Sequence, residues 1–210
     1  MTSAYPGLLA VWNDITAADE AEFNAWYEEE HFPERLGVPG ILTARRYRDS
    51  SAPLRYAAMY ETVSLAVLTS AAYLERLANP SPRTRAIMPR FRNMTRAACE
   101  IVADFGDRRS PGSVLACLEL NRPPSSEARA ALVTGGSAER VRIAFPDAQA
   151  TQVPNPEARF RGAPDRLPPP FVLIEGDDER AVSAAAERLG RSLAAPQPAR
   201  LFRLLLARDR

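Results

Sequence analysis

The two halves of this 210-residue chain show the same order of predicted secondary structure, and this repeat limits the possible folds more than any single motif does. In the first half, strands are predicted at 7–13, 41–48, 54–61 and 95–105, and helices at 18–31 and 65–77. The order is β-α-β-β-α-β. We therefore expect two related units, 1–106 and 112–210, with their boundary in the Gly- and Arg-containing segment between them.

The second half repeats this order less clearly. Its strands are predicted at 113–121, 140–145, 171–175 and 200–206, and its helices at 125–132 and 180–193. Each half thus has the element order of a ferredoxin-like α+β unit. The Pro-rich connection 153–170 is interpreted as a stiff surface loop, with a lid as the alternative, and chemistry is not expected in this half.

The first strand is apolar on both faces, because Leu8, Ala10 and Trp12 alternate with Leu9 and Val11. A four-stranded sheet covered by helices on one face would leave one of these stripes in water. Its open face should therefore pack on a second antiparallel sheet. The prediction is a pseudo-symmetric α+β barrel, formed either within the chain or through a homodimer, and a homodimer is expected.

Composition excludes several classes of function. The 27 basic and 26 acidic residues leave a net charge of +1, which argues against nucleic-acid or membrane partners. All the basic residues are arginines, and the lack of lysine excludes Schiff-base, pyridoxal phosphate and P-loop chemistry. Neither an apolar run of about 20 residues nor a signal peptide is present, so a cytoplasmic location is expected. Cys99 and Cys117 lack Cys or His neighbours at metal-ligand spacing and are predicted to be buried thiols.

The only histidine, His31, lies in the segment 22–36, where aromatic and titratable side chains are densest. Pro33 removes a backbone donor and disfavours helical geometry at the preceding residue, so the helix should stop or kink there. His31 is then expected at a helix C-terminus, where the helix dipole favours the imidazolium and proton donation. Helical spacing places a set of side chains on one face, Phe23, Asn24, Tyr27 and His31, with Trp26 and Glu30 on an adjacent stripe.

In the functional interpretation, His31 is a general acid or base, Tyr27 or Asn24 binds the substrate, and Glu30 or Glu34 orients the imidazole. The predicted substrate-binding residues are Trp12, Trp26, Glu30, Arg46 and Tyr60. The alternative is that His31 caps helix carbonyls while the aromatic rings pack on the sheet. No metal site is expected, because one histidine among solvated carboxylates makes a poor ligand set.

Two further groups have both a functional and a structural interpretation. Strand alternation sends one of Arg45 and Arg46 inward, where it could bind an anionic or enolate oxygen, and the other to solvent. The strand residues Trp12, Tyr56, Met59 and Tyr60 could line an aromatic pocket or form ordinary core.

The run Asn13, Glu22-Phe23-Asn24-x-Trp26-Tyr27-x-x-Glu30-His31-x-Pro33-Glu34-Arg35-Leu36, Val38–Ile41 and Ala44–Tyr47 resembles the signature of the dimeric α+β barrel superfamily, in particular its EthD-like members. The resemblance covers about the first 105 residues, and the second half only through its strand order. It implies a ferredoxin-like barrel with a cavity beside the helix that carries Asn24, Tyr27 and His31. It implies little about the reaction, since the superfamily includes monooxygenases, cyclases, dehydratases, isomerases and haem-handling proteins.

The leading hypothesis is a small cofactor-independent enzyme that performs a dehydration, cyclisation or isomerisation by proton transfer through His31. Its partner would be a small apolar, aromatic or polyketide-like molecule. One alternative is cofactor-free oxygenation of an electron-rich phenol. Another is a non-catalytic protein that binds a hydrophobic ligand, and haem binding is a further possibility.

Overall fold

The computed structural model describes residues 6–52, 54–106, 112–134, 140–153, 156–161 and 165–210. Its strands form one closed antiparallel barrel with the order β1-β3-β2-β8-β5-β7-β6-β4. The strands are β1 (Gly7–Asp14), β2 (Ile41–Asp49), β3 (Arg55–Thr62), β4 (Arg92–Phe105), β5 (Val114–Glu119), β6 (Arg140–Pro146), β7 (Phe171–Gly176) and β8 (Arg200–Asp209).

A single chain closes this barrel. Strands of the first half lie in the order β4-β1-β3-β2, those of the second half in the order β8-β5-β7-β6, and the two sets join through the pairs β2–β8 and β4–β6. Of the two arrangements predicted, the one within the chain is therefore formed. The sheets meet edge to edge, which removes the unpaired strand edges that each half would otherwise expose.

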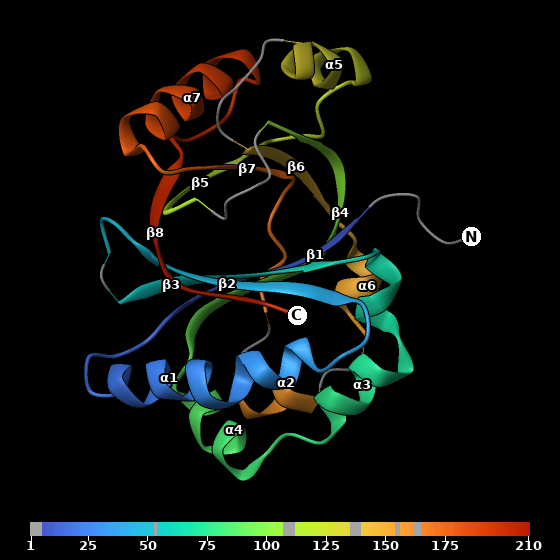
Figure 1. Cartoon of the computed structure of the whole chain (residues 1–210), viewed down its shortest axis with the longest axis vertical. Coiled ribbons are helices and arrows are strands. Elements are labelled where there is room, and N and C mark those ends of the chain that lie inside the picture. Colours follow the sequence, from blue (N-terminus) through green and yellow to red (C-terminus); the bar gives the residue numbers. More distant parts are fainter. Residues whose placement is uncertain (1–5, 53, 107–111, 135–139, 154–155, 162–164) are drawn as a thin grey trace.

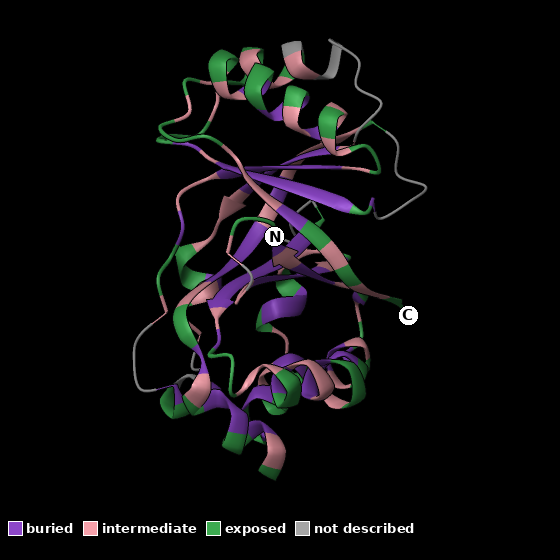
Figure 2. Cartoon of the chain, turned by 90° about the vertical axis from the view of Figure 1, so that its left-hand side faces the viewer, coloured by how far each residue is buried: buried purple, intermediate pink, exposed green. Residues whose placement is uncertain are grey.

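Two helical layers cover the barrel on opposite sides (Figure 1). The first half contributes α1 (Glu20–Trp26), the π-helical η1 (Tyr27–His31), α2 (Phe32–Leu36), the 3₁₀-helical η2 (Leu65–Thr69), α3 (Ala71–Ala78), α4 (Pro82–Ile87) and the 3₁₀ turn η3 (Met88–Arg90). The second half contributes α5 (Ser126–Thr134) and α7 (Glu179–Ser192), which form the other layer (Figure 1). Its α6 (Ala148–Thr151) and 3₁₀-helical η4 (Pro156–Phe160) pack instead with the helices of the first half. Figure 2 shows buried residues concentrated on the strands between the two layers.

Both faces of β1 are buried, as its pattern predicts. Leu8, Ala10 and Trp12 pack inside the barrel, whereas Leu9 and Val11 pack under the helices of the first half. The predicted buried thiols are confirmed, because Cys99 and Cys117 are both free and buried inside the barrel. Burial raises the pKa of the Cys117 thiol to about 12. No helix among the described residues is both long enough and apolar enough to cross a membrane.

Of the two alternatives predicted for the first helix at Pro33, a stop or a kink, the stop is wrong. After α1 the helix widens into one π-helical turn, in which the Phe32 N–H donates to the carbonyl of Tyr27, and it then continues as α2 to Leu36. Pro33 lies in the first turn of α2, where a proline ring is tolerated and its missing N–H is not needed. His31 is therefore inside a continuous helical segment rather than at its end.

Three other local predictions also differ from the structure. The helix predicted over 65–77 is divided into η2 and α3 at Ser70, whose hydroxyl accepts from the Tyr73 N–H and caps α3. Between the helix predicted to end at 77 and the strand predicted to begin at 95, where no element is predicted, the structure has α4 and η3. The connection 153–170 is not only a surface loop, because its helix η4 carries the buried carboxylate Glu157.

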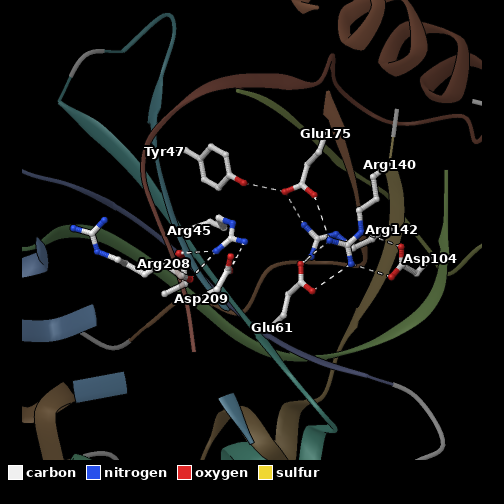
Figure 3. Close-up of polar contacts among 10 residues, drawn as sticks. Arg45, Tyr47, Glu61, Asp104, Arg140, Arg142, Glu175, Arg208 and Asp209 are labelled. Atoms are coloured by element: carbon white, nitrogen blue, oxygen red, sulfur yellow. Dashed lines mark hydrogen bonds and ion pairs between the residues drawn. The ribbon is translucent and has the colours of Figure 1, made fainter. Parts of the chain in front are cut away.

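One end of the barrel interior holds a network of charged side chains that joins the two halves (Figure 3). Arg142 of β6 pairs with Glu175 of β7 and Glu61 of β3, each at 2.9 Å. The Tyr47 hydroxyl on β2 donates to Glu175 at 2.9 Å, and Arg140 of β6 pairs with Glu61 at 2.8 Å. Because the carboxylates and guanidiniums neutralise one another, the network can be buried without an isolated charge.

Candidate functional site

A small cavity lies between the helices of the first half and the outer face of its strands, and Trp26, Tyr27, His31 and Tyr60 all line it. Its volume of about 30 Å³ exceeds the roughly 10–15 Å³ that one water molecule requires. The structure therefore brings together three residues of the predicted helix 18–31 and one residue, Tyr60, of the predicted strand 54–61.

The His31 ring is 7% exposed and lies among aromatic rings. Its centroid is 4.2 Å from that of Trp26, 5.1 Å from that of Tyr27 and 6.2 Å from that of Tyr60. Both the indole and the Tyr27 ring come from residues just before or within the π-helical turn. Single π-helical turns are frequent at functional sites, and here the turn gathers three rings around one cavity.

His31 is neutral in this environment. Burial, together with the charges of Arg35 and Arg46, lowers its pKa well below the ordinary 6.5. The expectation of an imidazolium that donates protons is therefore wrong, because the helix continues past His31 and cations rather than carboxylates face the ring. A neutral imidazole is suited to accept a proton.

Three buried polar atoms on the lining side chains make no hydrogen bond to any residue that the structure describes. They are His31 Nδ1, Tyr60 Oη and Arg35 Nη1. Burial raises the pKa of Tyr60 well above its ordinary value, with the nearby Tyr27 raising it further, so the Tyr60 hydroxyl keeps its proton. The cavity thus combines a proton acceptor with a hydroxyl donor and a guanidinium donor, a set that can hold an oxygen atom while its charge develops.

The charged groups around the cavity are mainly cationic. Arg35, Arg96 and Arg161 line it, whereas Glu157 is the carboxylate among the described lining residues. Arg35 Nη2 lies 2.7 Å from Glu157 Oε1, and both side chains are almost fully buried. Arg96 donates to the Tyr73 hydroxyl at 3.1 Å. Because Arg161 pairs with Asp165 at 2.6 Å and Arg35 with Glu157, the excess positive charge is that of Arg96, and it favours an anionic intermediate over a cationic one.

Sequence reasoning missed Glu157 and Arg161, and it gave Arg35 no role beyond its place in the motif. Glu157 and Arg161 come from the Pro-rich connection of the second half, and Glu157 lies 122 residues from Arg35 in the sequence. The only local signal was a glutamate and an arginine four residues apart in a Pro-rich stretch that also contains Arg159, Asp165 and Arg166.

Arg46 and Asn24 form a layer behind Tyr27 and do not line the cavity. The Arg46 guanidinium carbon is 4.6, 4.5 and 4.6 Å from the ring centroids of Phe23, Tyr27 and Tyr56. Its Nη2 donates to Asn24 Oδ1 at 2.6 Å. Arg46 is buried on the helix side, so the arrangement holds the Tyr27 ring in place and adds positive charge near His31.

Glu30 and Glu34 have partners other than His31, and Trp12 lies elsewhere. Glu30 accepts from Thr84, which in turn accepts from the Trp26 indole, each at 3.0 Å. Glu34 lies 3.7 Å from Arg76. Neither carboxylate is hydrogen-bonded to His31, so Glu30 anchors Trp26 rather than the imidazole. Trp12 lies on the other face of β1, inside the barrel.

The fold of this chain is similar over nearly its whole length to those of several solved structures. Over 99% of this chain and 95% of the other, it matches a candidate monooxygenase from Fusobacterium nucleatum with a TM-score of 0.61 and 11% identity. An anthrone oxidase-like protein matches over 100% and 95%, with a TM-score of 0.59 and 12% identity. A candidate chlorite dismutase, TA0507, matches over 97% and 96%, with a TM-score of 0.56 and 13% identity. No protein-family model and no curated protein matches the chain. At these identities the similarity establishes the fold alone.

Proposed function

We propose that this protein is a cofactor-independent enzyme that removes a proton from a small aromatic or polyketide-like molecule, with His31 as the base. The observation that carries the proposal is the buried, neutral imidazole with an unpartnered Nδ1 in the same cavity as Tyr60 Oη and Arg35 Nη1. The ferredoxin-like interpretation of each half and an EthD-like relationship are part of the same proposal.

In this mechanism, the imidazole takes a proton from a C–H or O–H group next to an aromatic ring or carbonyl. The Tyr60 hydroxyl and the Arg35 guanidinium stabilise the enolate or phenolate oxygen that forms. The imidazolium then returns the proton to another atom of the same molecule, which is an isomerisation. In a dehydration it protonates a leaving hydroxyl group, which departs as water.

The substrate must occupy space that protein atoms now fill, because a cavity of about 30 Å³ is smaller than an aromatic molecule. Met88 and Met94 line the same cavity. Their unbranched side chains change rotamer easily, and we propose that they move aside when the substrate binds. A haem, which is far larger, does not fit between the Trp26 indole and the His31 ring, whose centroids are 4.2 Å apart.

A second candidate is a cofactor-free monooxygenase, and the names of the structural neighbours favour it. Here the deprotonated substrate reacts with dioxygen. A methylene group becomes a carbonyl, one oxygen atom enters the product, and the other leaves as water. The first step is the same removal of a proton by His31, so both candidates need the same base.

The test measures proton removal separately from the later chemistry. Anthrone and a panel of polyketide-derived phenols are incubated with the protein in D₂O without oxygen, and deuterium incorporation is followed by mass spectrometry. The variant His31→Gln should lower the exchange rate by about 10²- to 10⁴-fold. Glu28→Gln, an exposed change in the same helical turn, should leave it unchanged.

Oxygen uptake in air then separates the two enzymatic candidates. Uptake that depends on His31 supports the monooxygenase, and exchange without uptake supports isomerisation or dehydration. Full exchange by a correctly folded His31→Gln protein would refute the role of His31. Saturable binding with neither exchange nor uptake would support the non-catalytic alternative.

A further inference from the structure

A second cavity lies at the end of the barrel where β1 and β5 finish, and its volume is about 240 Å³. Trp12, Asp14, Arg55, Glu119, Arg166 and Arg200 are among the residues that line it. Val11 lines the His31 cavity and the next residue, Trp12, lines this one, because successive side chains of a strand point to opposite faces. The sheet therefore separates the two cavities.

Trp12, which lines this cavity, carries a buried hydrogen-bond donor. Its side chain is 4% exposed, and its ring packs edge-on against Phe171 with the centroids 5.2 Å apart. The buried indole Nε1 has no hydrogen-bond partner in the part of the chain that the structure describes. A buried donor without an acceptor is unfavourable, so an acceptor atom bound in this cavity would be stabilised.

A β-bulge and the backbone of Arg166 lie side by side at this cavity. The register between β1 and β4 shifts between Trp12 and Asp14, and Asn93 on β4 adopts a φ of +50° there. Next to the bulge, the backbone of Arg166 is fixed to β4 by two hydrogen bonds of 3.0 Å, one with Met94 and one with Arg96. Bulges are frequent next to functional sites, and here the exposed residue Arg166 lines the cavity beside one.

The lining has one positive charge in excess. Asp14 Oδ1 accepts from Arg55 at 2.9 Å and its Oδ2 from Asn93 at 2.6 Å. Glu119 pairs with Arg200 at 3.4 Å. Arg166 has no ion-pair or side-chain hydrogen-bond partner within the described ranges. The lining arginines thus outnumber the lining carboxylates by one, and the unpaired charge is that of Arg166, whose backbone is hydrogen-bonded to β4.

We propose that this cavity is a second ligand site, which binds a small organic monocarboxylate through Arg166 and the Trp12 indole N–H. A guanidinium can donate two parallel hydrogen bonds to a carboxylate, and a single negative charge matches the single unpaired cation. The site lies on the opposite face of the sheet from His31, so it goes beyond the proposed proton transfer and does not depend on it.

Benzoate is the probe. The chain has two tryptophans, so the indole N–H region of a ¹H–¹⁵N spectrum contains two side-chain signals, and Trp12→Phe assigns them. Benzoate should shift the Trp12 signal saturably and leave the Trp26 signal in place. Arg166→Gln should weaken this binding at least tenfold. Arg188→Gln, which removes the same charge from an exposed position on α7, should not change it.

Sodium sulfate at matched ionic strength is the second arm. Little or no shift with sulfate supports a carboxylate site, and an equal shift would overturn it in favour of general anion binding. The proposal is also overturned if benzoate moves only the Trp26 signal, or if the folded Arg166→Gln protein binds benzoate as tightly as the wild type. None of these results depends on catalytic activity, so they leave the proposal for His31 untouched.

Discussion

At the scale of single residues, the protonation state of His31 follows from its neighbours rather than from its place in the helix. Burial is the largest influence on its pKa, followed by the charges of Arg35 and Arg46. Each of these favours the neutral ring, because a buried imidazolium would lose hydration and meet like charges. The same residue at an exposed helix C-terminus would be more basic.

We expect the pKa of His31 to rise when Arg46 is replaced by methionine, which keeps an apolar chain against the rings but removes the charge. The control is Arg45→Met on the same strand, since Arg45 pairs with Asp209 at 2.6 Å and is not among the causes of the shift. As the only histidine, His31 gives one Hε1 signal to titrate by NMR. A wild-type pKa at or above 6.5 would contradict this account of the site.

The lowered pKa also predicts how stability depends on pH. The unfolded chain binds the His31 proton more tightly than the folded protein does. The contribution of the neutral His31 to the free energy of unfolding is therefore fully present above pH 6.5. It is lost as the pH falls from 6.5 toward the folded pKa, by about 1.4 kcal/mol per unit. Urea unfolding of wild type and His31→Gln at several pH values measures the difference. If acidification instead stabilised the wild type relative to the variant, the prediction of a lowered His31 pKa would be contradicted.

At the scale of elements, the cavity depends on two features, the π-helical turn and the attachment of η4. The turn presents Trp26, Tyr27 and His31 to one cavity. The ion pair between Arg35 and Glu157 connects α2 to η4, which belongs to the other half of the chain. Both side chains are nearly inaccessible to water, so each relies on the other for compensation of its charge.

Replacing Arg35 by methionine should therefore destabilise the protein by about 3–5 kcal/mol, because it leaves the Glu157 carboxylate buried and unpaired. The double variant Arg35→Met/Glu157→Leu should recover most of that loss. Arg76→Met is a matched control on the more exposed pair with Glu34, and it should cost at most about 1 kcal/mol. Chemical denaturation measures all three. Equal losses of unfolding free energy for Arg35→Met and Arg76→Met would show that the buried ion pair contributes no more to stability than the exposed one.

At the scale of the whole molecule, the two halves share one closed barrel and one interior. Strand pairs β2–β8 and β4–β6 join them, and the charged network of Figure 3 links β3 of the first half with β6 and β7 of the second. A unit with so many contacts across its boundary should unfold as one cooperative body rather than as two domains.

The Trp26 ring packs on rings of the first half, whereas Trp12 packs on Phe171 of the second. The fluorescence of a Trp12→Phe protein therefore reports on the first half, whereas circular dichroism includes the long helix α7 of the second. We expect the two unfolding curves to coincide. Glu175→Gln, which weakens the network from the second half, should lower both midpoints equally. A shift of the circular dichroism curve alone would mean that the halves unfold independently.

Much of this protein follows from local sequence patterns. Alternation and helical periodicity predicted every barrel strand to within a few residues, the burial of both faces of β1, and the aromatic segment around His31. They succeed because side-chain direction repeats with a fixed period in each element, whatever the element later packs against. Of the predicted site residues, Trp26, Tyr27, His31 and Tyr60 meet at one cavity for this reason.

Tertiary structure decided the rest. Four features depend on contacts between segments distant in sequence. They are the π-helical turn before Pro33, the neutral state of His31, the position of Glu157 beside Arg35, and the position of Trp12 in a different cavity from His31. Closure of the barrel within one chain is a property of the same kind, since a strand pattern specifies which face is apolar but not which edge becomes its neighbour. The burial of a side chain and the electrostatic field around it depend on every segment packed against the site, and a local sequence pattern does not specify those segments.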